Sequence, residues 1–176
     1  HPLSPTVNRY QRLHLSRRKG NAVRQSLEKA GLVERVVIAT RSGQVVLYDL
    51  TDNGRTVCKN EHIEVAPVSR ESLEHRFWVL KVRDYYEKKG YEVKLEHPVK
   101  GNGAIDLLAV RPGEKIAVEV ETGKSDIKMN IANMKKAKLD KMVVLATSPE
   151  AVGACRNLIG EDKSSKSIIL MTWLDV

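Results

Sequence analysis

The sequence predicts an α/β protein of two domains, on the basis of charge and of the order of secondary structure. Residues 1–60 carry 11 Lys and Arg against 4 Asp and Glu, whereas residues 61–176 carry 19 against 18, so the first third supplies almost all of the formal net charge of +8. Residues 1–60 show the order helix, helix, hairpin, and residues 69–176 an αβββαβ order. We expect the boundary within residues 59–69, where no apolar period is sustained and Pro67 disfavours a helix.

The composition is that of a folded protein, with 41% hydrophobic and 30% charged residues. The longest apolar runs, such as MVVLAT, fall well short of the roughly 20 residues that span a bilayer, so no membrane partner is expected. Cys58 and Cys155 lack CxxC spacing, which predicts free thiols in a reducing cytoplasm. The chain begins at His1 without Met, and we expect it to be a fragment of a longer protein.

The basic first third has the pattern of a winged helix. Ser4-Pro5 is a helix-start signal, and Ser16 is expected to cap a second helix that Gly31 ends. The apolar residues at helical spacing are Val7, Tyr10 and Leu13 in the first helix, and Ala22, Val23, Leu27 and Ala30 in the second. VERVVIAT and QVVLYDL then flank Arg41-Ser42-Gly43 as a hairpin.

This stretch resembles winged helix-turn-helix domains. The LTDNGR run at residues 50–55 is similar to the LTxxGR that often follows the wing. A complete winged helix has another helix before the two predicted here, so we expect that helix to be missing or replaced.

The second helix would enter the major groove of DNA with its N-terminal side chains leading, and the hairpin tip would reach phosphate or the minor groove. The predicted DNA contacts are Arg17, Arg18, Lys19, Asn21, Arg24 and Arg41. The alternative is that these side chains form a solvated helix face and the domain packs on another protein.

Residues 69–176 predict a mixed sheet with helices on its faces. A long helix is expected from a cap at Ser69 to a stop at Gly90. The strands YEVKLEH, AIDLLAV and KIAVEVE follow, the last two joined by Pro112-Gly113. The remaining predicted elements are a helix from Asp126 to about Lys138, the strand MVVLAT, a helix from about Ser148 to Leu158, and the strand SIILMTWL.

Three carboxylates interrupt the apolar strands of this predicted sheet. Alternation places Glu119 and Glu121 on one face of a strand, about 6 to 7 Å apart, and Asp106 comes from the adjoining strand. Converging, partly buried carboxylates raise one another's pKa unless a cation compensates, and oxygen ligands favour Mg²⁺ or Mn²⁺. The alternative is an amphipathic strand whose glutamate face is simply wet, and the pattern does not separate the two.

The combination of Glu74, Asp106 and Glu119-Val120-Glu121 on an αβββαβ order resembles the PD-(D/E)XK nuclease superfamily, which includes many restriction enzymes and archaeal Holliday-junction resolvases. VEVETGKSD more narrowly resembles nuclease-like domains that follow a winged helix in archaeal ATPases and mobile-element proteins. The resemblance implies a restriction-endonuclease-like fold over about residues 69–176. It also implies Asp106, Glu119 and the Val120 carbonyl as metal ligands, with Glu74 contributing through water.

Glu121 departs from the family, because that position is usually Lys. A lysine would orient the attacking water and stabilise charge on the phosphate, whereas Glu offers a base or a metal ligand but no positive charge. Lys124, three residues on, is a candidate for the missing cation. The TGK run does not predict a phosphate-binding loop, because no G-x-x-x-x-G precedes it.

The sequence therefore predicts a Mg²⁺- or Mn²⁺-dependent DNA endonuclease acting on duplex or branched DNA. One alternative is an inactive nuclease fold that serves as a DNA-binding or regulatory protein, and another is a winged-helix transcription regulator whose second domain dimerises. The expected partners are DNA, an ATPase domain or missing N-terminal segment, and a second copy of the chain as a homodimer.

Overall fold

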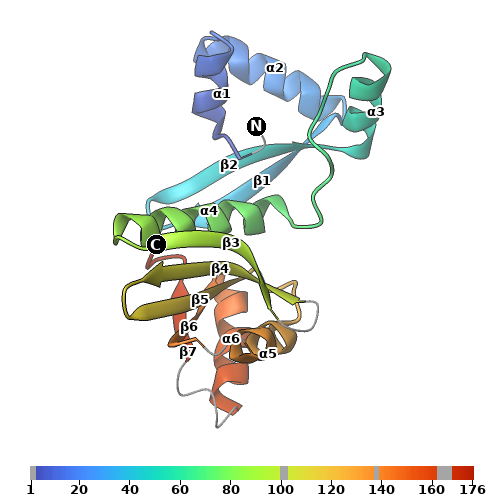
Figure 1. Ribbon diagram of the computed structural model, residues 1–176. Coiled ribbons are helices and arrows are strands. Elements are labelled where there is room, and N and C mark those ends of the chain that lie inside the picture. The colour runs from blue at the N-terminus through green and yellow to red at the C-terminus, as the bar shows by residue number, and fades with distance from the viewer. Residues whose placement is uncertain (1–2, 100–102, 137–138, 162–167) are drawn as a thin grey trace. The chain divides into compact units, whose positions relative to one another are not determined.

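The computed structural model of the chain describes residues 3–99, 103–136, 139–161 and 168–176 (Figure 1). Its contacts divide the chain into two compact units, His1–Arg76 and Phe77–Val176. The division falls within one continuous helix, α4 (Leu73–Lys88). The domain limits expected from the sequence, 1–60 and 69–176, stay a prediction.

The first unit contains two helices, a hairpin and a third helix. These are α1 (Thr6–Arg12), α2 (Arg17–Lys29), β1 (Val33–Thr40), β2 (Gly43–Leu50) and α3 (Asp52–Asn60). The predicted cap of α2 is confirmed, because the Lys19 N–H donates to Ser16 Oγ at 3.3 Å. The predicted hairpin is confirmed as well: β1 and β2 pair antiparallel along their whole length.

The apolar stripe of α2 does not face a core. Its residues Ala22, Val23, Leu27 and Ala30 are exposed, and the buried residue of this helix is Gly20. A Cβ at Gly20 would meet the ring of Tyr10, so α1 and α2 meet at a glycine rather than through the stripe. The Tyr10 hydroxyl also donates to Asn21 Oδ1 at 3.0 Å across the same contact.

The helix α3 was not predicted from the sequence. Thr51 caps it by accepting from the Gly54 N–H at 3.0 Å, and its hydroxyl donates to the Gly31 carbonyl at 2.6 Å. Gly54 is buried against the Leu32 carbonyl. The local signal was therefore the Thr-x-x-Gly spacing within LTDNGR, which places a cap oxygen three residues before a small residue.

The second unit is a mixed sheet with helices. Its elements are α4, which begins in the first unit, β3 (Glu92–Val99), β4 (Gly103–Arg111), β5 (Glu114–Glu121), α5 (Ile127–Lys136), β6 (Lys141–Ala146), α6 (Pro149–Glu161) and β7 (Ile168–Thr172). The strands lie in sequence order; the pairs from β3 to β5 are antiparallel, and those from β5 to β7 are parallel. The predicted mixed sheet and its element order are confirmed.

Several predicted element ends differ from the structure. The helix α4 begins at Leu73 rather than next to Ser69, because the His75 N–H donates to Ser72 Oγ at 3.1 Å and makes Ser72 the cap. Gly90, with φ of 81°, follows the helix end as expected. Residues 137–138 of the next predicted helix and residue 167 of the last predicted strand lie outside the described residues.

The helices α5 and α6 pack on the sheet and share an apolar core with it (Figure 1). This core joins Ile127, Ile131 and Met134 of α5 to Ala151 and Cys155 of α6, and both sets to strand residues that include Ile105, Ala117 and Val144. Cys58 and Cys155 are free thiols. In the described part of the chain, no helix combines the length and the apolar character needed to cross a membrane.

We expect Gly54→Ala to lower the free energy of unfolding by about 1 to 3 kcal/mol, because the added methyl group would overlap the Leu32 carbonyl. Gly153→Ala in α6 is the matched control. A Cβ there meets nothing within 4 Å, so alanine should leave stability unchanged or raise it by about 0.5 to 1 kcal/mol. Urea unfolding of the whole chain measures both, and equal effects would contradict the assigned packing of α3.

Candidate functional site

The site begins where two neighbouring strands part. The strand β4 pairs with β5 as far as Leu107 and Val118, and beyond this point each strand goes on beside its outer neighbour, β3 or β6. Asp106 and Glu119 are the first residues past the last pair. The two carboxylates therefore lie at the parting of the strands.

Asp106 links β4 to β5 at the point where the two strands separate. Its Oδ2 accepts a hydrogen bond from the Val120 N–H at 2.8 Å, in place of the backbone carbonyl that a continued ladder would supply. A buried backbone N–H without a partner is costly, so this bond fixes both the carboxylate and the end of β5. The half-buried Asp106 side chain is thereby held beside the strand that carries Glu119.

Glu119 is a buried carboxyl group, and one of its oxygens accepts no hydrogen bond. Its side chain is 2% exposed, and its Oε1 has no hydrogen-bond partner among the described residues. Burial, followed by the charge of Asp106 and a hydrogen bond to it, and then the charge of Glu121, raises the pKa of Glu119 to about 10. Without a cation, Glu119 therefore holds a proton at neutral pH.

Glu121 lies two residues further along β5 and is fully buried. Its Oε1 accepts from Asn130 Nδ2 at 2.8 Å, and its Oε2 accepts from Ser125 Oγ. The alternative of a wet glutamate face is wrong, because Glu119 and Glu121 are both buried. Sequence reasoning missed Ser125. For Asn130, one turn into the following helix, it favoured an exposed side chain over one that faces the site, whereas the structure has Asn130 half-buried and bonded to Glu121.

Asp106 and Glu119 thus form an acidic cluster in the second unit, and this cluster suits a divalent cation. Its donors are carboxylate oxygens, which hard cations such as Mg²⁺ and Mn²⁺ prefer. The buried Glu119 Oε1 without a hydrogen-bond partner, next to Asp106, is the observation that fits such an ion. A cation there would offset the burial and the repulsion from Asp106 that otherwise keep Glu119 protonated.

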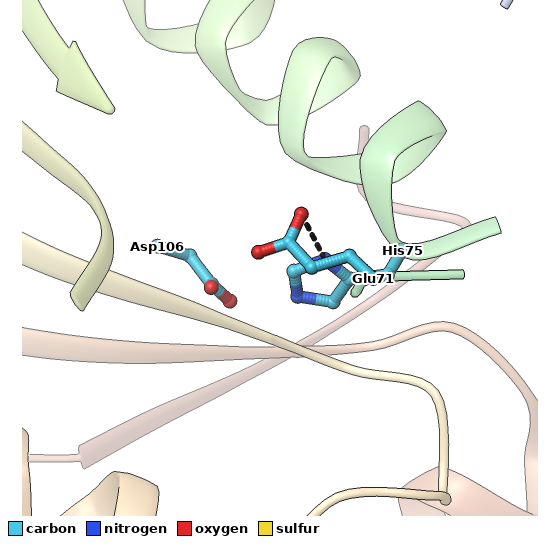
Figure 2. A group of neighbouring side chains, drawn as sticks. All are labelled: Glu71, His75 and Asp106. Carbon is cyan, nitrogen blue, oxygen red and sulfur yellow. Dashed lines mark ion pairs between the residues drawn. The ribbon is translucent and has the colours of Figure 1, made fainter. Parts of the chain in front are cut away.

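Figure 2 draws Glu71, His75 and Asp106, each of which offers an atom able to ligate a metal. His75 Nδ1 lies 3.3 Å from Glu71 Oε2 and forms the ion pair that the dashed line marks. Glu71, Glu74 and His75 belong to the first unit and Asp106 to the second. The acidic cluster is therefore assigned from carboxylates of the second unit alone, Asp106 and Glu119.

The half-buried Glu74 lies in the first turn of α4.

Among the predicted DNA contacts, the exposed side chains are Arg17, Arg18 and Lys19 at the start of α2, and Arg41 at the hairpin tip. Two others have internal partners. Asn21 accepts from Tyr10, and Arg24 Nη1 donates to the Tyr48 hydroxyl at 3.1 Å. Asn21 and Arg24 therefore help to hold α2 against α1 and β2. In the second unit, Lys124 is exposed in the turn after β5.

No protein-family model and no curated protein matches the chain. Among similar solved structures, one is a protein of unknown function, 22% identical over 55% of this chain and 57% of that one, with a TM-score of 0.39. Another is a repair endonuclease from Pyrococcus abyssi, 13% identical over 80% of this chain and 62% of that one, with a TM-score of 0.36. The chain spans about three fifths of the length of each.

The raised pKa of Glu119 predicts a specific pH dependence of stability. The carboxyl group has its ordinary pKa of 4.5 when unfolded and about 10 when folded, so between these values the folded state binds a proton that the unfolded state releases. The contribution of Glu119 to the free energy of unfolding is thus full below the lower value and is lost as the pH rises through the upper one.

We expect the melting temperature of the metal-free parent to fall more steeply with rising pH than that of Glu119→Gln, which cannot titrate at this position. Thermal unfolding in a chelating buffer measures both curves, and Glu92→Gln on the exposed part of β3 is the control. Parallel curves for the parent and Glu119→Gln would contradict the protonated, buried state of Glu119.

Proposed function

We propose that the second unit is a metal-dependent nuclease domain of the PD-(D/E)XK type, which hydrolyses a phosphodiester bond in duplex or branched DNA. The observation that carries this proposal is the placement of Asp106 and buried Glu119 at the parting of β4 and β5. The order of elements along the chain and the mixed sheet agree with that fold.

In this mechanism Asp106, Glu119 and the Val120 carbonyl would hold Mg²⁺ or Mn²⁺. The bound ion would supply a water of lowered pKa and neutralise charge on the phosphate. The hydrogen bond from the Val120 N–H keeps the Asp106 carboxylate oriented, so little reorganisation is needed when the ion binds. Glu119 would have to give up its proton to ligate the ion, so metal affinity would rise with pH.

The remaining catalytic assignments are proposals from the family pattern. Glu121 or Lys124 would position the nucleophile, and Glu74 would act through water. Lys124 is the side chain among these that could bring positive charge to the phosphate, as the usual lysine does. Its position in an exposed turn leaves it accessible to DNA.

We further propose that the first unit is a winged helix that binds DNA. Its support is the order of α1, α2, β1 and β2, with Arg17, Arg18 and Lys19 exposed at the start of α2. Residues 1–60 carry seven of the eight net positive charges, which favours a polyanionic partner. The cytoplasmic, archaeal and mobile-element setting, the ATPase partner and the homodimer stay predictions.

A binding protein without turnover is the second candidate function. The observation that favours it is Glu121 in place of the usual lysine, with both carboxylate oxygens already engaged by Asn130 and Ser125. Such a protein would keep the nuclease fold and the DNA affinity but would lack the cation that stabilises the transition state.

Replacing Arg17, Arg18 and Lys19 together with Ala should weaken DNA binding and flatten its salt dependence. Removing one cation that binds a phosphate should reduce the slope of log affinity against log salt by about one. A titration of labelled duplex at several salt concentrations measures this. Replacing the exposed Lys88, Lys94 and Lys115 is the control of equal charge. An equal effect of both triple variants would place DNA binding elsewhere.

Mg²⁺ or Mn²⁺ should raise the melting temperature of the parent, because a ligand that binds the folded state stabilises it. The parent should also cleave plasmid or four-way-junction DNA when either ion is present. Asp106→Asn and Glu119→Gln should lose both the metal-induced rise and the cleavage, whereas Glu92→Gln should keep them. Metal stabilisation without cleavage of any DNA form would favour the binding protein, and metal stabilisation that survives both substitutions would place the ion elsewhere.

A further inference from the structure

Glu121 joins four parts of the second unit. It ends β5, its two carboxylate oxygens accept from Ser125 in the following turn and from Asn130 on α5, and its backbone carbonyl accepts from the Thr147 N–H at 3.0 Å at the end of β6. The side chain is 0% exposed. The Ser125 hydroxyl, the Asn130 amide and the Thr147 N–H therefore all meet Glu121 at the C-terminal end of β5.

Glu119 and Glu121 differ in one decisive respect. They share a strand face and are both buried, but Glu119 Oε1 has no hydrogen-bond partner among the described residues, whereas each oxygen of Glu121 accepts a bond from a neutral donor. A buried carboxylate is costly unless hydrogen bonds replace its hydration. The protein itself supplies those bonds for Glu121, whereas it leaves Glu119 Oε1 able to accept a cation.

We propose that Glu121 is a positioning residue, neither a metal ligand nor a general base, and that Ser125 and Asn130 are the residues through which it holds the turn 122–126. This turn carries Lys124, so Glu121 acts on the reaction by setting where Lys124 lies. The assignment of Lys124 as the phosphate-facing cation rests on the proposed function. The anchoring of the turn by Glu121 is independent of the proposed function.

The backbone of the turn depends on this anchor. Gly123 has φ of 81°, a conformation that a side chain would strain. The Ile127 N–H donates to the Ser125 carbonyl at 3.1 Å, and Asp126 accepts from Met129 and Asn130 at 3.1 and 3.0 Å to begin α5. Releasing Ser125 from Glu121 would therefore loosen both the turn and the first turn of α5.

Hydrogen exchange on the metal-free whole chain tests the anchor directly. Ser125→Ala and Asn130→Ala should each make the amides of residues 127–130 exchange about tenfold faster or more, since each removes a hydrogen bond to a charged group. Ser125→Thr keeps the hydroxyl and should restore nearly the parent rate. Ser148→Ala is the matched control, because it removes the hydroxyl that accepts from the Ala151 N–H and should loosen only α6.

Metal binding separates positioning from ligation. Glu121→Gln keeps the shape of the side chain and should retain most of the Mn²⁺-induced rise in melting temperature, whereas Glu119→Gln should lose it. If Glu121→Gln does not fold, the exchange rates of Ser125→Ala and Asn130→Ala decide whether Glu121 anchors the turn. Loss of the Mn²⁺ effect in Glu121→Gln as complete as in Glu119→Gln would overturn the proposal, as would parent exchange rates in both Ser125→Ala and Asn130→Ala.

Cleavage kinetics test the link to Lys124. Ser125→Ala should lower kcat with KM little changed, and adding it to Lys124→Ala should cause little further loss, because both changes remove one effect. Fully multiplicative losses would overturn the link. A parent that shows neither Mn²⁺ stabilisation nor cleavage would overturn the proposed function instead, and the exchange rates would still decide whether Glu121 anchors the turn.

Discussion

The parting of β4 from β5 after Leu107 and Val118 is the constraint on which the acidic site depends. Where two strands separate, backbone groups on their facing edges lose the partners that a ladder provides. Here the Asp106 carboxylate provides one for the Val120 N–H. The same hydrogen bond that satisfies the Val120 N–H brings the Asp106 carboxylate next to Glu119. One contact therefore completes the edge of the sheet and forms the acidic site.

Burial then gives two glutamates of β5, Glu119 and Glu121, different chemistry. Glu119 is enclosed beside another carboxylate, and its pKa rises accordingly. Glu121 is enclosed too, but hydroxyl and amide donors surround it. Glu121 also affects Cys155. Burial of the Cys155 thiol, together with the charge of Glu121, raises its pKa to about 11. That thiol is therefore a protonated core side chain at neutral pH and not a nucleophile.

The first unit is organised differently, because polar contacts supply much of its cohesion. The helix α1 has no buried residue, and α2 buries only Gly20. Arg9 donates to the carbonyls of Ser4 and Tyr48, both at 2.9 Å, and Arg24 donates to the Tyr48 hydroxyl. The cations of this unit thus divide into those that hold helices to the hairpin and those, such as Arg17, that are exposed.

Apart from α3, the sequence by itself determined the order of helices and strands, the hairpin of the first unit, the mixed sheet of the second, and the placement of Glu119 and Glu121 on one strand face. These features follow from local periodicity, caps and turns, which a short stretch of chain encodes. It also predicted that Asp106 would come from the adjoining strand, because short turns leave few pairings open.

Only the tertiary structure decided what those residues touch. The exposure of the α2 stripe follows from the close approach of Tyr10 to Gly20, and α3 depends on the fit of Gly54 under Leu32. The different states of Glu119 and Glu121 depend on Ser125 and Asn130, which reach back from a turn and a helix. Alternation along β5 assigns both glutamates the same face, but hydrogen bonding and burial are set by whichever distant segments fold over that face, and no local pattern encodes them.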